Sequence, residues 1–144
     1  MKVIGFGFDK LHANRYDSYN GKSNKTTNIE ITNVVKEDLP FNATDSESYR
    51  ISFRFEINYF DAEAKKETKV GEVAIEGFIN LLMEEDKAKD LVKSWKKKEL
   101  VEGVKQPLFN LILRKCTTKA LELEENVNLP SHIPIPQLRL GKKD

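Results

Sequence analysis

The sequence has little cysteine, almost no net charge and no long apolar run. Its 144 residues include one cysteine, Cys116, so no internal disulfide can form, which fits a reducing compartment. One thiol cannot build a thiolate metal site, and the two histidines, His12 and His132, lie far apart without zinc-ligand spacing. We therefore expect neither a metal nor a cofactor.

The charge balance argues against two further classes of protein. Lysine and arginine number 24 against 23 aspartates and glutamates, which leaves a net charge of +1. General nucleic-acid binders carry a strong basic excess, so we expect no nucleic acid as a partner, and an acidic docking protein is equally disfavoured. No segment approaches the ~18 apolar residues of a membrane span, and the first ten residues hold no apolar run of signal-peptide length. We predict a cytoplasmic protein without stable membrane insertion.

Alternating hydrophobicity is the main signal that the sequence does contain. From Tyr49 to Tyr59 every second residue is apolar or aromatic, which predicts a long strand with one aromatic face. Similar runs at 3–16, 27–35 and 69–82 predict three more strands, and the turn-rich connections between them favour an antiparallel meander over about residues 3–83. The pattern leaves open whether the chain's own helices cover the aromatic face or part of it is kept for a ligand.

Two helices are predicted over about residues 84–125. In the first, acids come early and lysines late, the order that the helix dipole favours, and an apolar stripe runs through Leu91, Val92 and Trp95. The second, from about residue 102, has a broad apolar face that includes Leu108 and Phe109.

A proline-containing tail completes the predicted domain. Pro130, Pro134 and Pro136 forbid a helix there, so the segment 126–144 should be extended. Strands followed by helices predict one α+β domain over residues 1–144, a four-stranded antiparallel sheet with two C-terminal helices packed on one face.

No group of residues in the sequence predicts catalysis. Glu72 and Glu76 share a strand face, but at ~3.3 Å per residue they lie ~13 Å apart, too far for the usual glycosidase pair. Cys116 lies on the apolar face of the second helix without a base to activate it. The run Lys96–Lys98 suits the end of a helix better than a nucleic-acid or lipid contact. We expect no enzyme and no catalytic residues.

The order of elements resembles the SecB-type protein-export chaperones. Four antiparallel strands, a short helix, a long helix and an extended tail occupy about residues 3–140. The stretch Val73-Ala-Ile-Glu-Gly-Phe78 resembles that family's strand leading into its first helix, and Leu129-Pro-Ser-His-Ile-Pro-Ile-Pro-Gln-Leu138 resembles its apolar C-terminal segment.

The resemblance implies a SecB-like fold and an ATP-independent holdase that binds unfolded or non-native polypeptide clients in apolar grooves. It also implies a homotetramer, a dimer of dimers, with the first helix at subunit contacts. The resemblance further implies a role in protein export or with a toxin–antitoxin client. Docking to the export motor is in doubt, because that family uses an acidic sheet surface and the outward strand residues here, such as Arg54 and Glu56, are mixed in charge.

The expected contacts follow from the apolar positions. We expect client contact from seven residues: Phe6, Phe8, Phe53, Phe55, Phe78, Leu108 and Phe109. Leu91, Val92 and Trp95 are expected at the oligomer interface. The alternative is a small-ligand-binding module, or an enzyme, whose curved aromatic sheet wraps a closed pocket around a helix.

Overall fold

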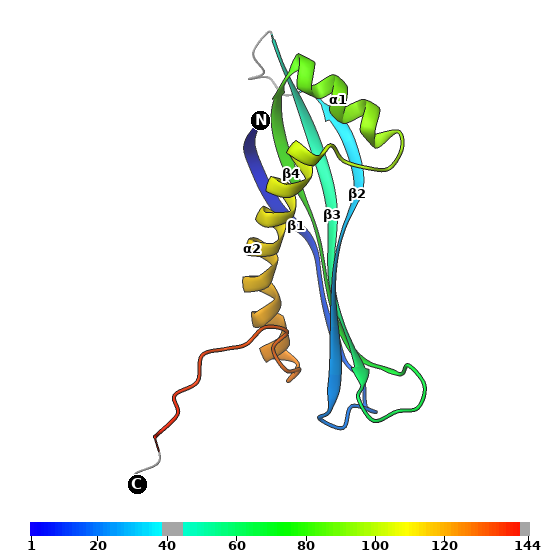
Figure 1. Ribbon diagram of the computed structural model, residues 1–144, viewed down its shortest axis with the longest axis vertical. Helices are drawn as coiled ribbons and strands as arrows, with labels where there is room; N and C mark the ends of the chain where they lie inside the picture. Colours follow the sequence, from blue (N-terminus) through cyan, green and yellow to red (C-terminus); the bar gives the residue numbers. More distant parts are fainter. Residues whose placement is uncertain (39–44, 142–144) are drawn as a thin grey trace.

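The computed structural model describes residues 1–38 and 45–141. Residues 39–44 of the predicted connection and residues 142–144 of the predicted tail lie outside the described residues. The elements are β1 (Lys2–Arg15), β2 (Ser23–Glu37), β3 (Ser46–Asp61), β4 (Lys69–Glu84), α1 (Glu85–Trp95) and α2 (Glu102–Asn126). Figure 1 shows a tall, narrow, twisted sheet with α2 running along it and α1 across its upper end. The predicted α+β fold, an antiparallel four-stranded sheet with two C-terminal helices on one face, is confirmed.

The strand order is β1-β4-β3-β2, so the meander prediction was wrong for the first strand. Strands β2, β3 and β4 do follow one another as antiparallel neighbours, but β1 crosses over to pair with β4. Small residues on β1 lie beside bulky ones on β4 at this seam. A Cβ on Gly7 would stand 2.7 Å from the ring of Phe78, and a Cβ on Gly77 only 2.4 Å from the Gly7 carbonyl oxygen. The two glycines therefore let the strands approach closely around aromatic rings.

The core lies between the inner face of the sheet and the helices. Alternate residues of β3 and β4 are fully buried, from Tyr49 to Tyr59 and from Val73 to Met83. Helix α2 faces them with a buried residue at every fourth position, namely Val104, Leu108, Ile112, Cys116, Ala120 and Glu124. Each fully buried large apolar side chain stabilises the fold by about 1.5–3 kcal/mol. Most of the aromatic face of β3 is thus covered by the chain itself.

The outer face of the sheet is polar and mixed in charge. Arg54 on β3 bridges the carboxylates of Glu56 and Glu76, with nitrogen–oxygen distances of 3.1 Å to each. The guanidinium of Arg50 lies 3.8 Å from the ring centre of Phe78 and covers that aromatic side chain. Exposed pairs of this kind contribute little to stability. They keep the outer face solvated rather than acidic.

Candidate functional site

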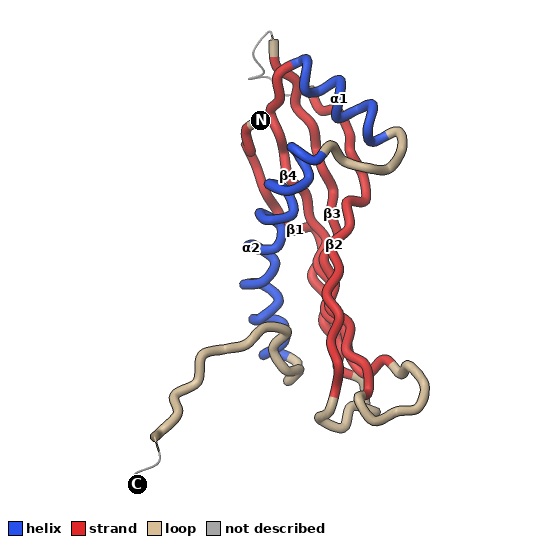
Figure 2. The backbone as a smooth tube through the Cα atoms, viewed as in Figure 1, coloured by secondary structure: helices blue, strands red, loops and turns tan. Residues whose placement is uncertain are grey.

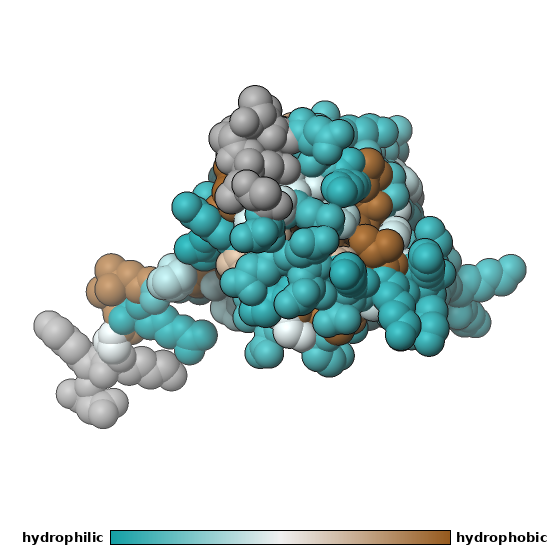
Figure 3. Space-filling view, turned by 90° about the horizontal axis from the view of Figure 1, so that it is seen from above, coloured by the Kyte–Doolittle hydropathy of each residue, from teal (hydrophilic) through white to brown (hydrophobic). Residues whose placement is uncertain are grey.

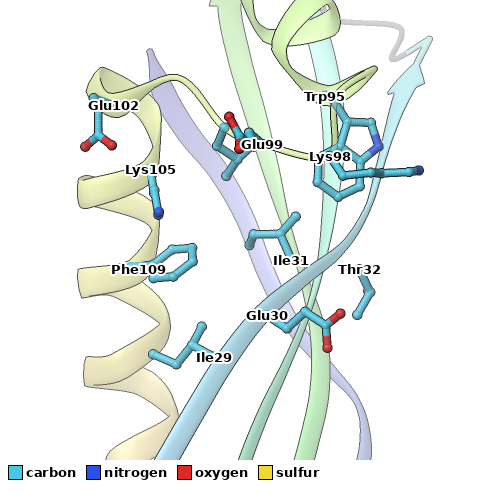
Figure 4. A pocket seen from close by; sticks show the side chains of 11 residues that line it. Ile29, Glu30, Ile31, Thr32, Trp95, Lys98, Glu99, Glu102, Lys105 and Phe109 are labelled. Atoms are coloured by element: carbon cyan, nitrogen blue, oxygen red, sulfur yellow. The ribbon is translucent and has the colours of Figure 1, made fainter.

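A groove opens on the inner face where β2, the end of α1, the following loop and the first turns of α2 meet. Its volume is about 660 Å³. Five apolar or aromatic side chains line it, all of them half-buried: Ile29, Ile31, Trp95, Leu100 and Phe109. Figure 4 shows Phe109 of α2 directed toward Ile29 and Ile31 of β2 across the gap, with Trp95 above them. We call this hollow the β2 groove.

Local sequence explains why these side chains meet. The strand period puts Ile29 and Ile31 on the inner face, opposite Phe55 and Phe53 of β3. At the end of α1 the chain takes a left-handed conformation at Lys98, with φ of 59°. This residue closes a turn, because its N–H donates to the carbonyl oxygen of Trp95 at 2.8 Å. The turn leads the chain back toward β2, so that Leu100 joins Trp95 in the upper wall of the groove.

Charged groups form the rim of the β2 groove. Glu99 and Glu102 supply two carboxylates beside the two ammonium groups of Lys98 and Lys105, and Glu30 adds a third carboxylate from the outer face of β2. Lys98 Nζ lies 4.9 Å from the ring centre of Trp95, and the Lys105 ammonium lies 5.7 Å from that of Phe109. Cation–π contacts of this kind hold the aromatic rings in place. An apolar segment with charged or polar flanks suits this combination of floor and rim.

The β2 groove runs beside a free strand edge. The strand order places β2 at the margin of the sheet, with β3 paired along one of its two edges. Across residues 1–38 and 45–141, no strand pairs with its other side. Edge strands present backbone N–H and C=O groups that an extended peptide can pair with, while neighbouring hollows take alternate side chains. The groove therefore offers both backbone and apolar contacts to one ligand.

A second pair of hollows lies on the other side of α2, beside β1. One, of about 430 Å³, has Phe6, Leu108 and Leu111 in its lining, and the next, of about 440 Å³, contains Phe8. Phe6 stacks on Phe53 with ring centres 5.5 Å apart. The rim here is basic, since Arg114, Lys115 and Lys119 face one carboxylate, Glu122, which Lys119 pairs with at 2.9 Å. We call these two hollows the β1 groove.

The residues expected to contact clients fall into three groups. Phe53, Phe55 and Leu108 are at most 1% exposed and belong to the core. Phe6, Phe8 and Phe109 are half-buried and line the two grooves. Phe78 lies on the outer face of the sheet beneath Arg50, away from both grooves. In this arrangement the second group offers the larger contact surface on the inner face, because core packing encloses Phe53 and Phe55 and leaves Leu108 only at the border of the β1 groove.

The expected interface residues are also separated. Leu91 is fully buried in the core of its own chain, whereas Val92 is 40% exposed. Trp95 lies in the wall of the β2 groove together with Phe109. Ile29 and Ile31 belong to the strand predicted at 27–35, for which no ligand role was expected, and Leu100 was not among the expected contacts. Their strand alternation gave the face but carried no signal of where α1 and α2 leave that face uncovered.

A buried polar cluster was missed altogether. Glu124 and His132 have side chains only 2% and 3% exposed, and His132 Nδ1 lies 2.9 Å from Glu124 Oε1. The Tyr59 hydroxyl contacts the other oxygen of Glu124 and stands 2.7 Å from the Pro130 carbonyl oxygen. Burial, followed by the carboxylate of Glu124, raises the pKa of the Tyr59 hydroxyl. The signal was available, since Glu124 continues the four-residue spacing of the buried stripe on α2.

This cluster fastens the chain after α2. Glu124 lies on α2, Tyr59 on β3 and His132 on the tail, so three separate segments meet there. Solvent has almost no access to the Glu124 carboxylate or the His132 imidazole. Burial also raises the pKa of the Cys116 thiol to about 12, which keeps it protonated and unreactive. Throughout the described part of the chain, no three His, Cys, Asp or Glu side chains are placed to hold a metal ion. No helix of that part is long and apolar enough to cross a bilayer.

Comparison with known proteins adds one structural likeness. No protein-family model matches the sequence, and no curated protein matches it. Among solved structures, the chain is similar to the Mycobacterium tuberculosis Rv1957 SecB-like chaperone, solved in complex with a ChAD peptide from the Rv1956 HigA1 antitoxin. The sequences are 12% identical, and the superposition covers 99% of this chain and 92% of the other with a TM-score of 0.49.

Proposed function

We propose that this protein is an ATP-independent holdase that binds extended apolar segments of non-native polypeptides. The observation that carries the proposal is the β2 groove, an apolar hollow that runs beside a free strand edge. A client strand gains backbone hydrogen bonds at that edge and buries apolar side chains between Ile31 and Phe109. Such burial is worth about 25 cal/mol per Å² and has no directional requirement. Many client sequences are therefore accepted, and no nucleotide is needed.

Client contact is assigned to the half-buried residues alone. Phe109 and Trp95 serve the β2 groove, and Phe6 and Phe8 extend the apolar surface on the other side of α2. Because two separate grooves flank one helix, a long client can occupy both, and several weak contacts on one molecule raise the overall avidity. Assembly into a dimer of dimers would multiply that effect. Val92, exposed on α1, is the remaining candidate for an α1 contact between subunits.

The geometry disfavours the alternative of a closed ligand pocket. A pocket wrapped by the sheet would need space along the inner face of β3, but the inward side chains from Tyr49 to Tyr59 are enclosed in the core between the sheet and the helices.

The outer face, with Arg54 between two glutamates, does not provide the acidic surface that SecB-type export chaperones use to dock their motor. A general or dedicated chaperone role fits this surface better than motor docking.

Light scattering of a chemically unfolded, aggregation-prone client tests the proposal. At a several-fold molar excess and without ATP, the protein should suppress aggregation. Ile31→Ala and Phe109→Ala should weaken suppression, each by about tenfold in the concentration needed, which corresponds to about 1.4 kcal/mol. Matched controls are Val35→Ala on β2 and Leu113→Ala on α2, because both side chains are exposed and outside the groove. An absence of suppression by the wild-type protein would end the proposal.

A further inference from the structure

The segment that follows His132 is firmly held at its base and exposed beyond it. Leu129 is buried and its N–H donates to the Glu124 carbonyl oxygen at 2.9 Å, and His132 is held by the Glu124 carboxylate. Further on, Leu138 and Leu140 are 92% and 90% exposed. We call residues 133–140 the arm. Figure 3 shows apolar atoms of this arm projecting from the side of the body.

The backbone of the arm is suited to pairing with a strand along one edge only. Alternate residues of a strand direct their N–H and C=O groups to the same side. Pro134 and Pro136, two residues apart, therefore remove donors from the same edge and leave the other edge complete. That complete edge belongs to Ile133, Ile135 and the odd-numbered residues after them. The arm thus has the chemistry of an edge strand, and the free edge of β2 is a partner for it.

Charge distinguishes between the two grooves as the docking site. The arm carries Arg139, and the sequence continues with Lys142 and Lys143 against one acid, Asp144. On the inner face, Glu99 and Glu102 balance Lys98 and Lys105 on the rim of the β2 groove, and Glu30 lies on the opposite face of the same strand. The β1 groove exposes Arg114 and Lys115, which repel a basic segment. Electrostatic repulsion therefore disfavours the β1 groove, and the β2 groove is the better docking site for the arm.

The arm is directed away from the β2 groove of its own chain. In Figure 1 it leaves below the end of α2 on the side away from β2, whereas that groove lies higher, between α1 and β2. From Tyr59, which holds the base of the arm, to Phe53, the register partner of Ile31, six residues of β3 span about 20 Å. Eight arm residues reach about 26 Å when fully extended. If the arm folded back onto its own chain, most of its length would be used to reach the β2 groove, and little would remain to bind there.

We propose that the arm of one copy docks in the β2 groove of a second copy, pairing with its β2 edge and placing Leu138 and Leu140 against its apolar floor. The proposal rests on the proposed function of that groove and adds its regulation. A docked arm competes with client, so that self-association covers the apolar groove in the absence of client and client releases it.

Peptide binding to an armless protein tests the docking site. A variant ending at His132 keeps the buried base, and a fluorescent peptide of residues 133–144 is titrated against it by anisotropy. We expect saturable binding, at least tenfold weaker when the peptide carries Leu138→Asp with Leu140→Asp. Ile31→Ala in the armless protein should weaken binding by a similar factor, and Val35→Ala should leave it unchanged. No saturable binding, or equal effects of Ile31→Ala and Val35→Ala, overturns the proposal.

Mass and client measurements separate this proposal from the chaperone function. Sedimentation of the full chain should show an average mass that rises with concentration, and the armless variant should show a lower mass at each concentration. Equal masses would mean that the arm binds its own chain or nothing, and would overturn exchange between copies. The armless variant should also suppress client aggregation at a concentration at least twofold lower. If it suppresses aggregation but fails to bind the peptide, the arm proposal falls and the chaperone function stands.

Discussion

Two regions of the sheet's inner face differ in how completely they are covered. At the lower end, around Tyr59, the second half of α2 and the chain that follows it close over the strands, and a carboxylate, an imidazole and a phenol are sealed within. In the middle of the edge strand β2, by contrast, Ile29 and Ile31 remain half-buried beneath a gap between α1 and α2. Figure 2 shows the short loop that joins α1 to α2 passing in front of the strands.

This difference shows that one alternating strand pattern can serve as core and as site within the same sheet. The inner face of β3 is apolar from Tyr49 to Tyr59, whereas the apolar residues on the inner face of β2 are confined to its middle, at Ile29, Ile31 and Val34. The covering layer also differs, because the lower end is covered by α2 together with the residues from Leu129 to His132, whereas Ile29 and Ile31 have only the margins of two helices above them. Burial in the first region stabilises the fold, and incomplete burial in the second leaves apolar surface for a ligand.

The largest expected effect is at Tyr59, in the fully covered lower end of the sheet, which we call the closed end. Tyr59→Ala removes a fully buried ring and its contacts with Glu124 and Pro130, so it should lower the free energy of unfolding by about 3–5 kcal/mol. Urea unfolding measures this change. Phe60→Ala is the control, since the neighbouring ring lies on the half-exposed outer face and should cost less. Equal losses of unfolding free energy for the two variants would contradict the complete burial of Tyr59 in the closed end.

Two adjacent residues of α2 test the comparison within a single turn. Leu108 is fully buried, and Leu108→Ala should cost about 2–5 kcal/mol of stability. Phe109 is half-buried in the β2 groove, so Phe109→Ala should cost only about 1 kcal/mol, roughly half the value for full burial. Client binding, measured at equal folded fraction, should reverse this order. If Leu108→Ala impaired binding more than Phe109→Ala did, the groove would be misplaced.

A smaller effect is expected at His132. His132→Ala leaves the buried Glu124 carboxyl group without one of its hydrogen-bond partners, which should cost about 1–3 kcal/mol. Ser131→Ala, one residue earlier, should change the unfolding free energy by less than about 0.5 kcal/mol. Susceptibility of the tail to a protease should rise in the first variant only. Unchanged stability and unchanged proteolysis in His132→Ala would show that the cluster does not hold the tail.

Much of the fold could be predicted from the sequence because it depends on local periods. Alternation marked the four strands, and three- and four-residue spacing marked both helices, with α2 ending at Asn126 close to the expected residue 125. The neighbour of β1 could not be predicted in this way. Strand order depends on contacts between distant segments, such as Gly7 beneath Phe78. The alternation of apolar and polar residues along a strand is the same whichever strand pairs with it.

The candidate site was predictable only in part, for a related reason. A sequence period identifies which face of a strand is apolar but not which portion of that face a helix covers. Phe53 and Phe109 therefore seemed equivalent, although one is enclosed and the other lines the β2 groove. The buried cluster around Glu124 gave a clearer signal, because a carboxylate in a run of buried positions requires partners. Only the folded chain shows that His132 and Tyr59 are those partners.

The last expected effect is a gradual loss of stability in alkali. Burial, and then the hydrogen bond to Glu47, raises the pKa of Tyr49 to about 12, and the pKa of Tyr59 is raised as well. A folded protein with raised tyrosine pKa values keeps protons that the unfolded chain releases above about pH 10. The stabilisation is therefore complete below about pH 10 and declines as the pH rises toward 12, by at most about 1.4 kcal/mol per pH unit for each tyrosine.

Urea unfolding between about pH 9 and 12 measures this decline and sharpens the comparison of the two ends. Tyr59→Phe should flatten the decline by removing the titrating group of the closed end, and Tyr49→Phe should do so for the upper part of β3. Tyr19→Phe is the control, because that side chain is only partly buried. The difference has a physical cause, since both core phenols must lose a proton without water to solvate the anion. A decline that persists in the double variant Tyr49→Phe with Tyr59→Phe would place the alkaline sensitivity in other groups. The titration of the buried phenol would then make no contribution to the pH dependence of the unfolding free energy.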